Sequence, residues 1–113
     1  MSLNILSDSW YQVADARVAL LDTVQAQPQR FRGRPWVVLQ DPYAHRFFRV
    51  SPEAYAFLRA LQPEHTVDEV WRAQAAAHPD TVPGQDDVVR LLSQLHVANL
   101  LYFREQPHND AIF

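Results

Sequence analysis

The chain has 113 residues, the size of one ordinary domain, and 48% of them are hydrophobic, which is enough for one core. It contains no Cys, which excludes a disulfide framework and a thiolate metal site and fits a cytoplasmic location. Its longest apolar runs are far shorter than the ~20 residues that a membrane span requires, so we expect no membrane span in this chain. The N-terminus has no basic segment followed by a long apolar run, so no signal peptide is expected.

The net charge of −3 is unevenly distributed along the chain. Residues 23–50 carry five Arg and one Asp, a balance of +4, whereas residues 51–113 carry four Arg and nine acidic residues, a balance of −5. A nucleic-acid-binding domain concentrates its cations on the face that meets phosphate. Because the segments expected to be helical are acidic, the charge pattern predicts no nucleic-acid partner.

Three segments in the first half of the chain have the composition of strands: residues 24–31, 36–40 and 46–50. The second is rich in aromatic and β-branched residues. Pro28 interrupts the first segment and marks it as the edge of a sheet. Gly33, Arg34 and Pro35 form a turn signal between the first two. We therefore expect a small antiparallel meander.

The second half of the chain contains three segments in which apolar residues recur with helical spacing. Ser51 followed by Pro52 predicts a helix start, with the side chain of Ser51 as the N-cap. Thr66 and Glu69 match a capping box at the start of the second helix. The third helix follows Gly84 and ends at Asn99, and residues 100–103 then form a short strand or wing.

The order of these elements predicts an α+β fold of the winged helix-turn-helix type. In this arrangement a three-stranded antiparallel sheet packs on a three-helix bundle, with a short C-terminal wing. We expect residues 1–22 to form an irregular arm that lies on the domain and residues 23–106 to form the domain itself. Residues 107–113 are expected to be a tail that continues into a longer protein.

The sequence contains no recognisable catalytic or metal-binding motif. Its five His residues include no pair with the i, i+4 spacing of a helical zinc site, and there is no His-Glu-x-x-His motif. Asp86 and Asp87 are adjacent on a helix and point in different directions, and their charge is favourable at a helix start. We therefore expect no metal, no cofactor and no enzymatic activity in this chain.

The pair Phe47 and Phe48 indicates a surface feature. Strand side chains alternate between the two faces of a sheet, so the two rings cannot both enter the core. One large ring must face outward, where it is either covered by the N-terminal arm or lines a groove.

Several runs of the sequence together resemble the PqqD-like domains, also called RiPP precursor recognition elements. The runs are WVVLQDP (36–42), RFFRVSPEAY (46–55), TVDEVW (66–71), QDDVVRLLSQLH (85–96) and SWYQVA (9–14). The likeness covers residues 9–113 and is nearest to the cytosolic N-terminal region of site-2-protease-type membrane peptide zinc metalloproteases. The His-Glu-x-x-His motif and the membrane helices of such proteases are absent from this chain.

The resemblance implies that the domain binds a leader peptide, or acts as a peptide chaperone, by adding the peptide as a strand. The peptide would pair with the third strand and lie between this strand and the third helix. The implied peptide-binding residues are Arg46, Phe47, Phe48, Arg49, Val50, Val89, Ser93 and His96. Spacing alone does not say which flank of the third helix faces the strand, so the other flank remains an alternative. Arg46 and Arg49 would favour acidic residues and the outward Phe an apolar one, so the expected partner is an acidic-apolar peptide or protein segment.

Two alternatives remain open from the sequence. The chain could be a structural, regulatory or homodimerisation module of a fused enzyme. A DNA-binding winged helix is less favoured, because its recognition helix would begin with Asp86 and Asp87 and would carry a single Arg90.

Overall fold

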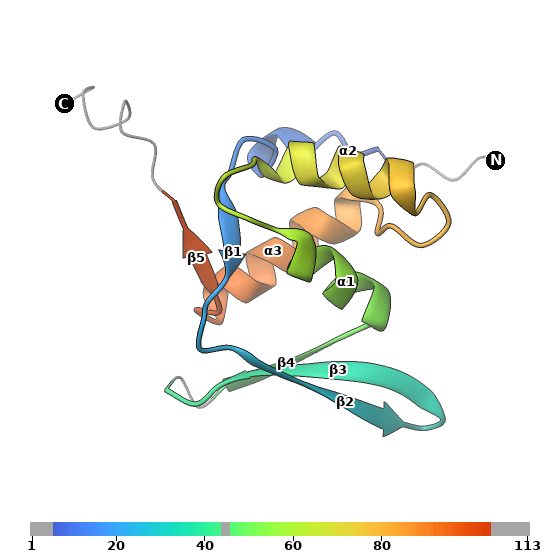
Figure 1. Ribbon diagram of the computed structural model, residues 1–113, viewed down its shortest axis with the longest axis vertical. Helices are drawn as coiled ribbons and strands as arrows, with labels where there is room; N and C mark the ends of the chain where they lie inside the picture. The colour runs from blue at the N-terminus through green and yellow to red at the C-terminus, as the bar shows by residue number, and fades with distance from the viewer. Residues whose placement is uncertain (1–5, 44–45, 105–113) are drawn as a thin grey trace.

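The computed structural model describes residues 6–43 and 46–104, which form an α+β fold of three α-helices and two small antiparallel sheets (Figure 1). In chain order the elements are the 3-10 turn η1 (Trp10–Gln12), β1 (Val18–Leu20), β2 (Gln25–Phe31), β3 (Arg34–Asp41), β4 (Arg46–Val50), α1 (Pro52–Ala60), α2 (Val67–Ala77), α3 (Gln85–Val97) and β5 (Leu101–Phe103). The predicted α+β class and the predicted order of three strands followed by three helices are confirmed. The predicted C-terminal tail, residues 107–113, lies outside the described residues.

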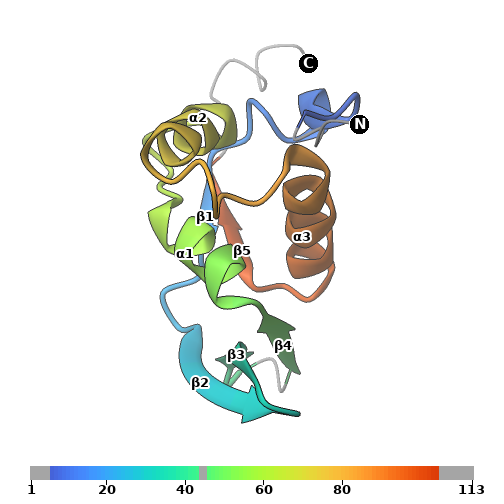
Figure 2. The same cartoon turned by 90° about the vertical axis from the view of Figure 1, so that its right-hand side faces the viewer.

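The helices lie on one side of the β2-β3-β4 sheet, and the β1-β5 pair stands beside them (Figures 1 and 2). Helix α1 contacts β3, β1 and α2, so it lies at the centre of the packing. The largest fully buried side chains are Val18, Leu39, Phe57, Leu58, Val67, Val88, Leu95 and Leu100. Because these residues come from strands of both sheets, all three helices and the segment that enters β5, they form one shared core.

A two-residue turn joins β2 to β3. Arg32 and Gly33 both have positive φ values, 54° and 76°, as a type I′ turn requires. The turn therefore lies one residue earlier than predicted, and Arg34 and Pro35 already belong to β3. Pro28 lies in β2, an outer strand of the sheet, as predicted.

The predicted helix starts are confirmed by hydrogen bonds. The Ser51 hydroxyl accepts from the Ala54 N–H at 3.0 Å, and Thr66 and Glu69 form the complete capping box. The bond from the Thr66 N–H to the Glu69 carboxylate is the main cause of the lowered pKa of Glu69. Asn99 has a φ of 61°, the left-handed conformation expected where α3 ends.

The N-terminal arm contains more regular structure than the sequence predicted. Its residues 10–12 form η1, and β1 pairs with β5 in a separate two-stranded sheet, with Val18 opposite Phe103. The residues expected to form a wing are therefore one strand of this pair. The expectation of an irregular arm was wrong at β1 because a three-residue strand has almost no local signal and is defined by a partner more than 80 residues away.

Candidate functional site

β4 is an edge strand of the three-stranded sheet. The strand order is β2-β3-β4, and β4 pairs antiparallel with β3 along its whole length. Within residues 6–43 and 46–104, no strand pairs with the other side of β4. Alternate N–H and C=O groups on that side therefore point away from the sheet, which is the geometry that accepts an added strand.

The two neighbouring phenylalanines of β4 face opposite sides of the sheet, as the alternation of strand side chains predicted. Phe48 is partly buried and packs against the core, whereas Phe47 is 71% exposed. Cross-strand pairing places Phe47 opposite Gln40, on the face of the sheet that points away from the helices. Phe47 is therefore the outward ring.

The described part of the N-terminal arm does not cover this ring, because it is attached to the far side of the domain. The backbone N–H of Ser7 donates to Oε1 of the buried Gln85 at 3.0 Å, and the Ser7 hydroxyl donates to the carboxylate of Asp86. These contacts fix the arm at the start of α3. The prediction that the arm lies on the domain is confirmed for these residues, and the alternative in which it hides Phe47 is wrong for them.

A second set of contacts fixes the arm to the start of α2. The Trp10 indole N–H donates to Oδ1 of Asp68 at 2.8 Å, and the Trp10 ring centroid lies 5.7 Å from that of Trp71. Arg72 donates to the other oxygen of Asp68 at 2.8 Å. The hydrogen bond from Trp10 is the main cause that lowers the pKa of Asp68, partial burial opposes it, and Arg72 lowers the pKa further. The carboxylate therefore stays ionised and holds the arm on α2.

A groove of about 220 Å³ lies between β4 and α3. In Figure 2, β4 is the strand of the three-stranded sheet nearest to α3. The groove has an apolar floor, to which Phe48 and Val50 of β4 and Leu91 of α3 contribute. Its α3 side also carries Gln94 and the ion pair between Asp87 and Arg90, in which the N···O distance is 3.3 Å. An apolar floor beside an unpaired strand edge is suited to an extended peptide.

The side of α3 that borders this groove is not the side implied by the resemblance. Of the residues expected there, Ser93 and His96 instead line a cavity of about 190 Å³ beside η1, β1 and β5. His96 contacts Phe103 in this region, with ring centroids 4.8 Å apart. Val89 is partly buried and packs against the core. By helical spacing these three residues share one side of α3, and this is not the side that borders the groove beside β4.

The structure also shows where the guanidinium of Arg49 lies. Its Cζ atom is 5.8 Å from the ring centroid of Trp36 and 4.9 Å from that of Phe31, so the side chain reaches back across the sheet. Arg49 borders the groove, but its charge is held over the outer face. Arg46 begins β4, and its side chain is outside the described part of the structure.

Trp36 adds a polar group that sequence reasoning did not identify. It lines the groove, and its indole N–H is buried without an acceptor among the described residues. An unsatisfied buried donor costs about 1–3 kcal/mol. Because this nitrogen is buried, a ligand in the groove would meet the ring of Trp36 and not its N–H.

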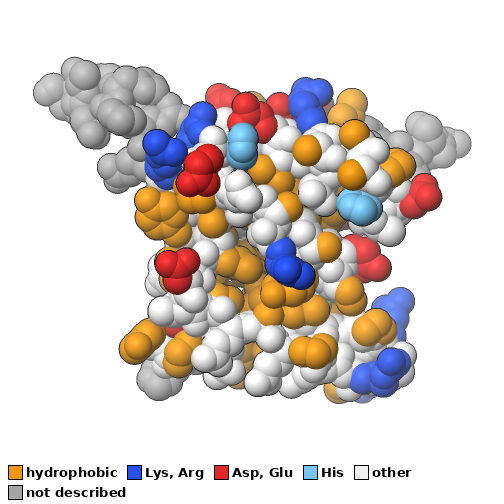
Figure 3. Space-filling view, viewed as in Figure 1, with side chains coloured by type: hydrophobic (Ala, Val, Ile, Leu, Met, Phe, Trp, Pro, Cys, Tyr) orange, Lys and Arg blue, Asp and Glu red, His pale blue; other side chains and the backbone are white. Residues whose placement is uncertain are grey.

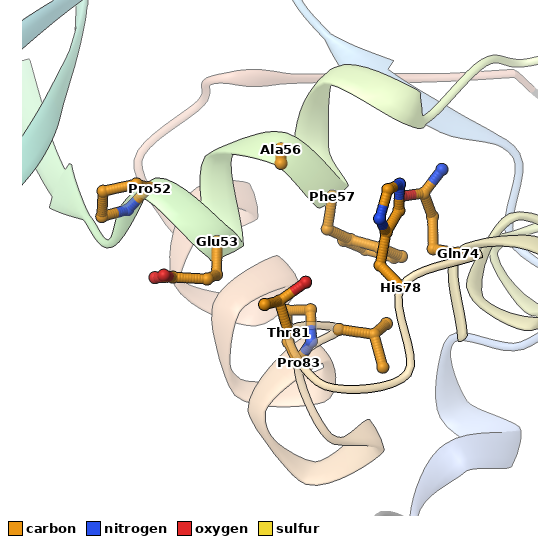
Figure 4. A pocket seen from close by; sticks show the side chains of 9 residues that line it. Pro52, Glu53, Ala56, Phe57, Gln74, His78, Thr81 and Pro83 are labelled. Atoms are coloured by element: carbon orange, nitrogen blue, oxygen red, sulfur yellow. The ribbon is translucent and has the colours of Figure 1, made fainter. Parts of the chain in front are cut away.

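A further hollow of about 240 Å³ lies between α1 and the connection from α2 to α3 (Figure 4). Gln74 and His78 lie side by side at one end of it, next to Phe57, and Glu53 lies at the other end. Across the residues that the structure describes, no three or more His, Cys, Asp or Glu side chains gather in a way that could hold a metal ion. Among the same residues, no helix combines the length and apolar character needed to cross a membrane.

The chain matches no family model, no curated protein and no solved structure.

Proposed function

We propose that this chain is a non-catalytic peptide-binding domain that captures an extended peptide along the free edge of β4. The observation that carries the proposal is that one strand has both an unpaired edge and, beside it, an apolar groove closed on its far side by α3. Backbone pairing gives affinity for any extended chain, and the groove gives selectivity for its side chains. The resemblance of the sequence to PqqD-like domains supports the same proposal.

Strand addition would place alternate side chains of the peptide in different surroundings. Those on the inner side would meet Phe48, Val50 and Leu91, so they should be apolar. Those on the outer side would meet Phe47, and Arg49 would have to leave its place over Phe31 of β2 to contact an acidic residue there. Because a single peptide strand buries ~1,000 Å² or less, the expected affinity is micromolar or weaker.

We further propose that the three helices form a winged helix-turn-helix with β5 as its wing. The domain would lie in the cytoplasm as the N-terminal part of a membrane peptidase. The sequence resemblance supports both proposals.

The test compares two charge substitutions on opposite sides of α3. Peptides would be selected from a random-sequence library on the immobilised protein, and their affinities measured by calorimetry. Gln94→Glu places a negative charge in the groove, and Ser93→Glu places the same charge on the other side of the helix. Both residues are exposed, so neither substitution should disturb folding.

Gln94→Glu should weaken binding of an acidic-apolar peptide about tenfold, which corresponds to ~1.4 kcal/mol, whereas Ser93→Glu should leave it unchanged. Proline substitutions in the peptide, which remove backbone donors, should also weaken binding. Equal effects of the two charge substitutions, or selected peptides that tolerate proline throughout, would overturn the proposal.

A homodimerisation module is the second candidate, because the unpaired edge of β4 and the exposed Phe47 would suit the same strand of a second copy. Sedimentation over a range of protein concentrations distinguishes the two. A dimer that dissociates in the presence of a selected peptide supports capture at β4, whereas a dimer that excludes all peptides supports the second candidate.

A further inference from the structure

The outer face of the β2-β3-β4 sheet is a surface separate from the groove. The helices lie on the other side of this sheet, and the outer face has a hollow of about 400 Å³. Gln27 and Gln29 of β2, Gln40 of β3 and Phe47 of β4 line it. The strand register explains why they meet, because Gln27 lies opposite Val38 and Gln40 lies opposite Phe47.

These side chains combine three amides with an uncovered ring. Each amide offers both hydrogen-bond donors and an acceptor, and can therefore pair with the edge of a nucleobase. The ring of Phe47 is 71% exposed, so a planar group can stack on it. Open sheets bind single-stranded nucleic acids through this combination of stacking rings and polar groups that reach the base edges.

The charge of the same face is positive. Arg side chains gather at the β2-β3 turn (Figure 3). The guanidinium groups of Arg32 and Arg49 both lie over the ring of Phe31, at 5.3 and 4.9 Å from its centroid. Stacking restrains these groups, so less entropy is lost when they bind a phosphate. The only acidic residue in residues 23–50 is Asp41, which is 5% exposed and belongs to the inner face.

We propose that this outer face binds a short segment of single-stranded nucleic acid, ~2–3 nucleotides long. A base would enter the hollow, stack on Phe47 and pair with the glutamine amides, while phosphates contact Arg32 and Arg49. An acidic peptide would use the two arginines but would leave the row of amides without a role. The expectation of no nucleic-acid partner came from the acidic third helix, and this surface does not involve that helix.

The protein is added at low salt to a labelled oligouridine octamer and, separately, to a labelled oligothymidine of equal length. Binding is followed by the fluorescence anisotropy of each oligonucleotide. Binding should weaken as salt rises, with a logarithmic slope of about −1.4 for two phosphate contacts. Phe47→Ala and Gln27→Ala should each weaken binding, Phe47→Ala by about fivefold or more. Gln94→Glu, in the groove on the other side of the sheet, should leave it unchanged.

Two results would overturn the proposal. One is the absence of binding to both oligonucleotides at low salt. The other is binding that Phe47→Ala and Gln27→Ala leave unchanged and that heparin displaces completely, since this would indicate attraction to any polyanion. Gln27 lies on β2, away from the edge of β4, so Gln27→Ala should not affect a selected peptide. The two proposals can therefore fail separately.

Discussion

The contact between Trp10 and Asp68 should make a measurable contribution to stability, because it attaches the N-terminal arm to α2. Trp10→Phe removes the indole N–H that donates to Oδ1 of Asp68 at 2.8 Å and keeps a ring next to Trp71. A hydrogen bond to a charged group is worth about 1.5–3 kcal/mol. Asp68 is 27% exposed and keeps its bond to Arg72, so we expect a loss of about 1–2 kcal/mol, near the lower end of that range.

A loss of this size should lower the melting temperature by roughly 4–10 °C in a chain of this length. The assay is thermal and urea unfolding followed by circular dichroism. Tyr11→Phe is the matched control, because Tyr11 is the next residue and is 76% exposed; we expect it to change stability by less than about 0.5 kcal/mol. If Trp10→Phe proves as stable as the control, this contact does not hold the arm in place.

Three further predictions concern the pH dependence, the core and the sheet surface. The folded-state pKa of Asp68 lies below its ordinary value of 3.8, so its stabilisation should be complete above that pH and lost as the pH falls through the lowered value. Urea unfolding at several pH values should therefore show Asp68→Asn as less stable at neutral pH, with the difference vanishing in acid; a constant difference would contradict this cause. Leu39→Ala should cost about 2–5 kcal/mol in the same assay, because Leu39 is fully buried, and a cost below 1 kcal/mol would contradict its place in the core. Phe47→Ala should change the free energy of unfolding by less than about 0.5 kcal/mol, and a larger loss would mean that the ring packs against the protein.

The elements that the sequence predicted well are those whose ends are marked by local chemistry. Ser51 and the pair Thr66 and Glu69 are cap residues, and their hydrogen bonds form between residues three positions apart. Such bonds depend little on the rest of the fold. The pair Phe47 and Phe48 was equally informative, because strand alternation alone requires the two rings to face opposite sides.

The features that the sequence did not predict depend on distant partners. β1 is a strand because β5 pairs with it. A segment of three residues is too short for the alternation of its side chains to predict this pairing. The spacing of Val89, Ser93 and His96 placed them on one side of α3, but only the packed fold shows which side borders β4. The side chain of Arg49 is long enough to reach Phe31 across β3, and no local rule predicts that direction.

Backbone amide chemical shifts during a peptide titration show whether β4 accepts a foreign strand. With an acidic-apolar peptide selected on the protein, we expect the largest shifts at residues 46–50 and along the groove side of α3, at Asp87, Arg90, Leu91 and Gln94. We also expect slower hydrogen exchange for the outward-pointing amides of β4. Shifts confined to the arm, to the β1-β5 pair or to the cavity beside His96 would contradict strand addition at β4.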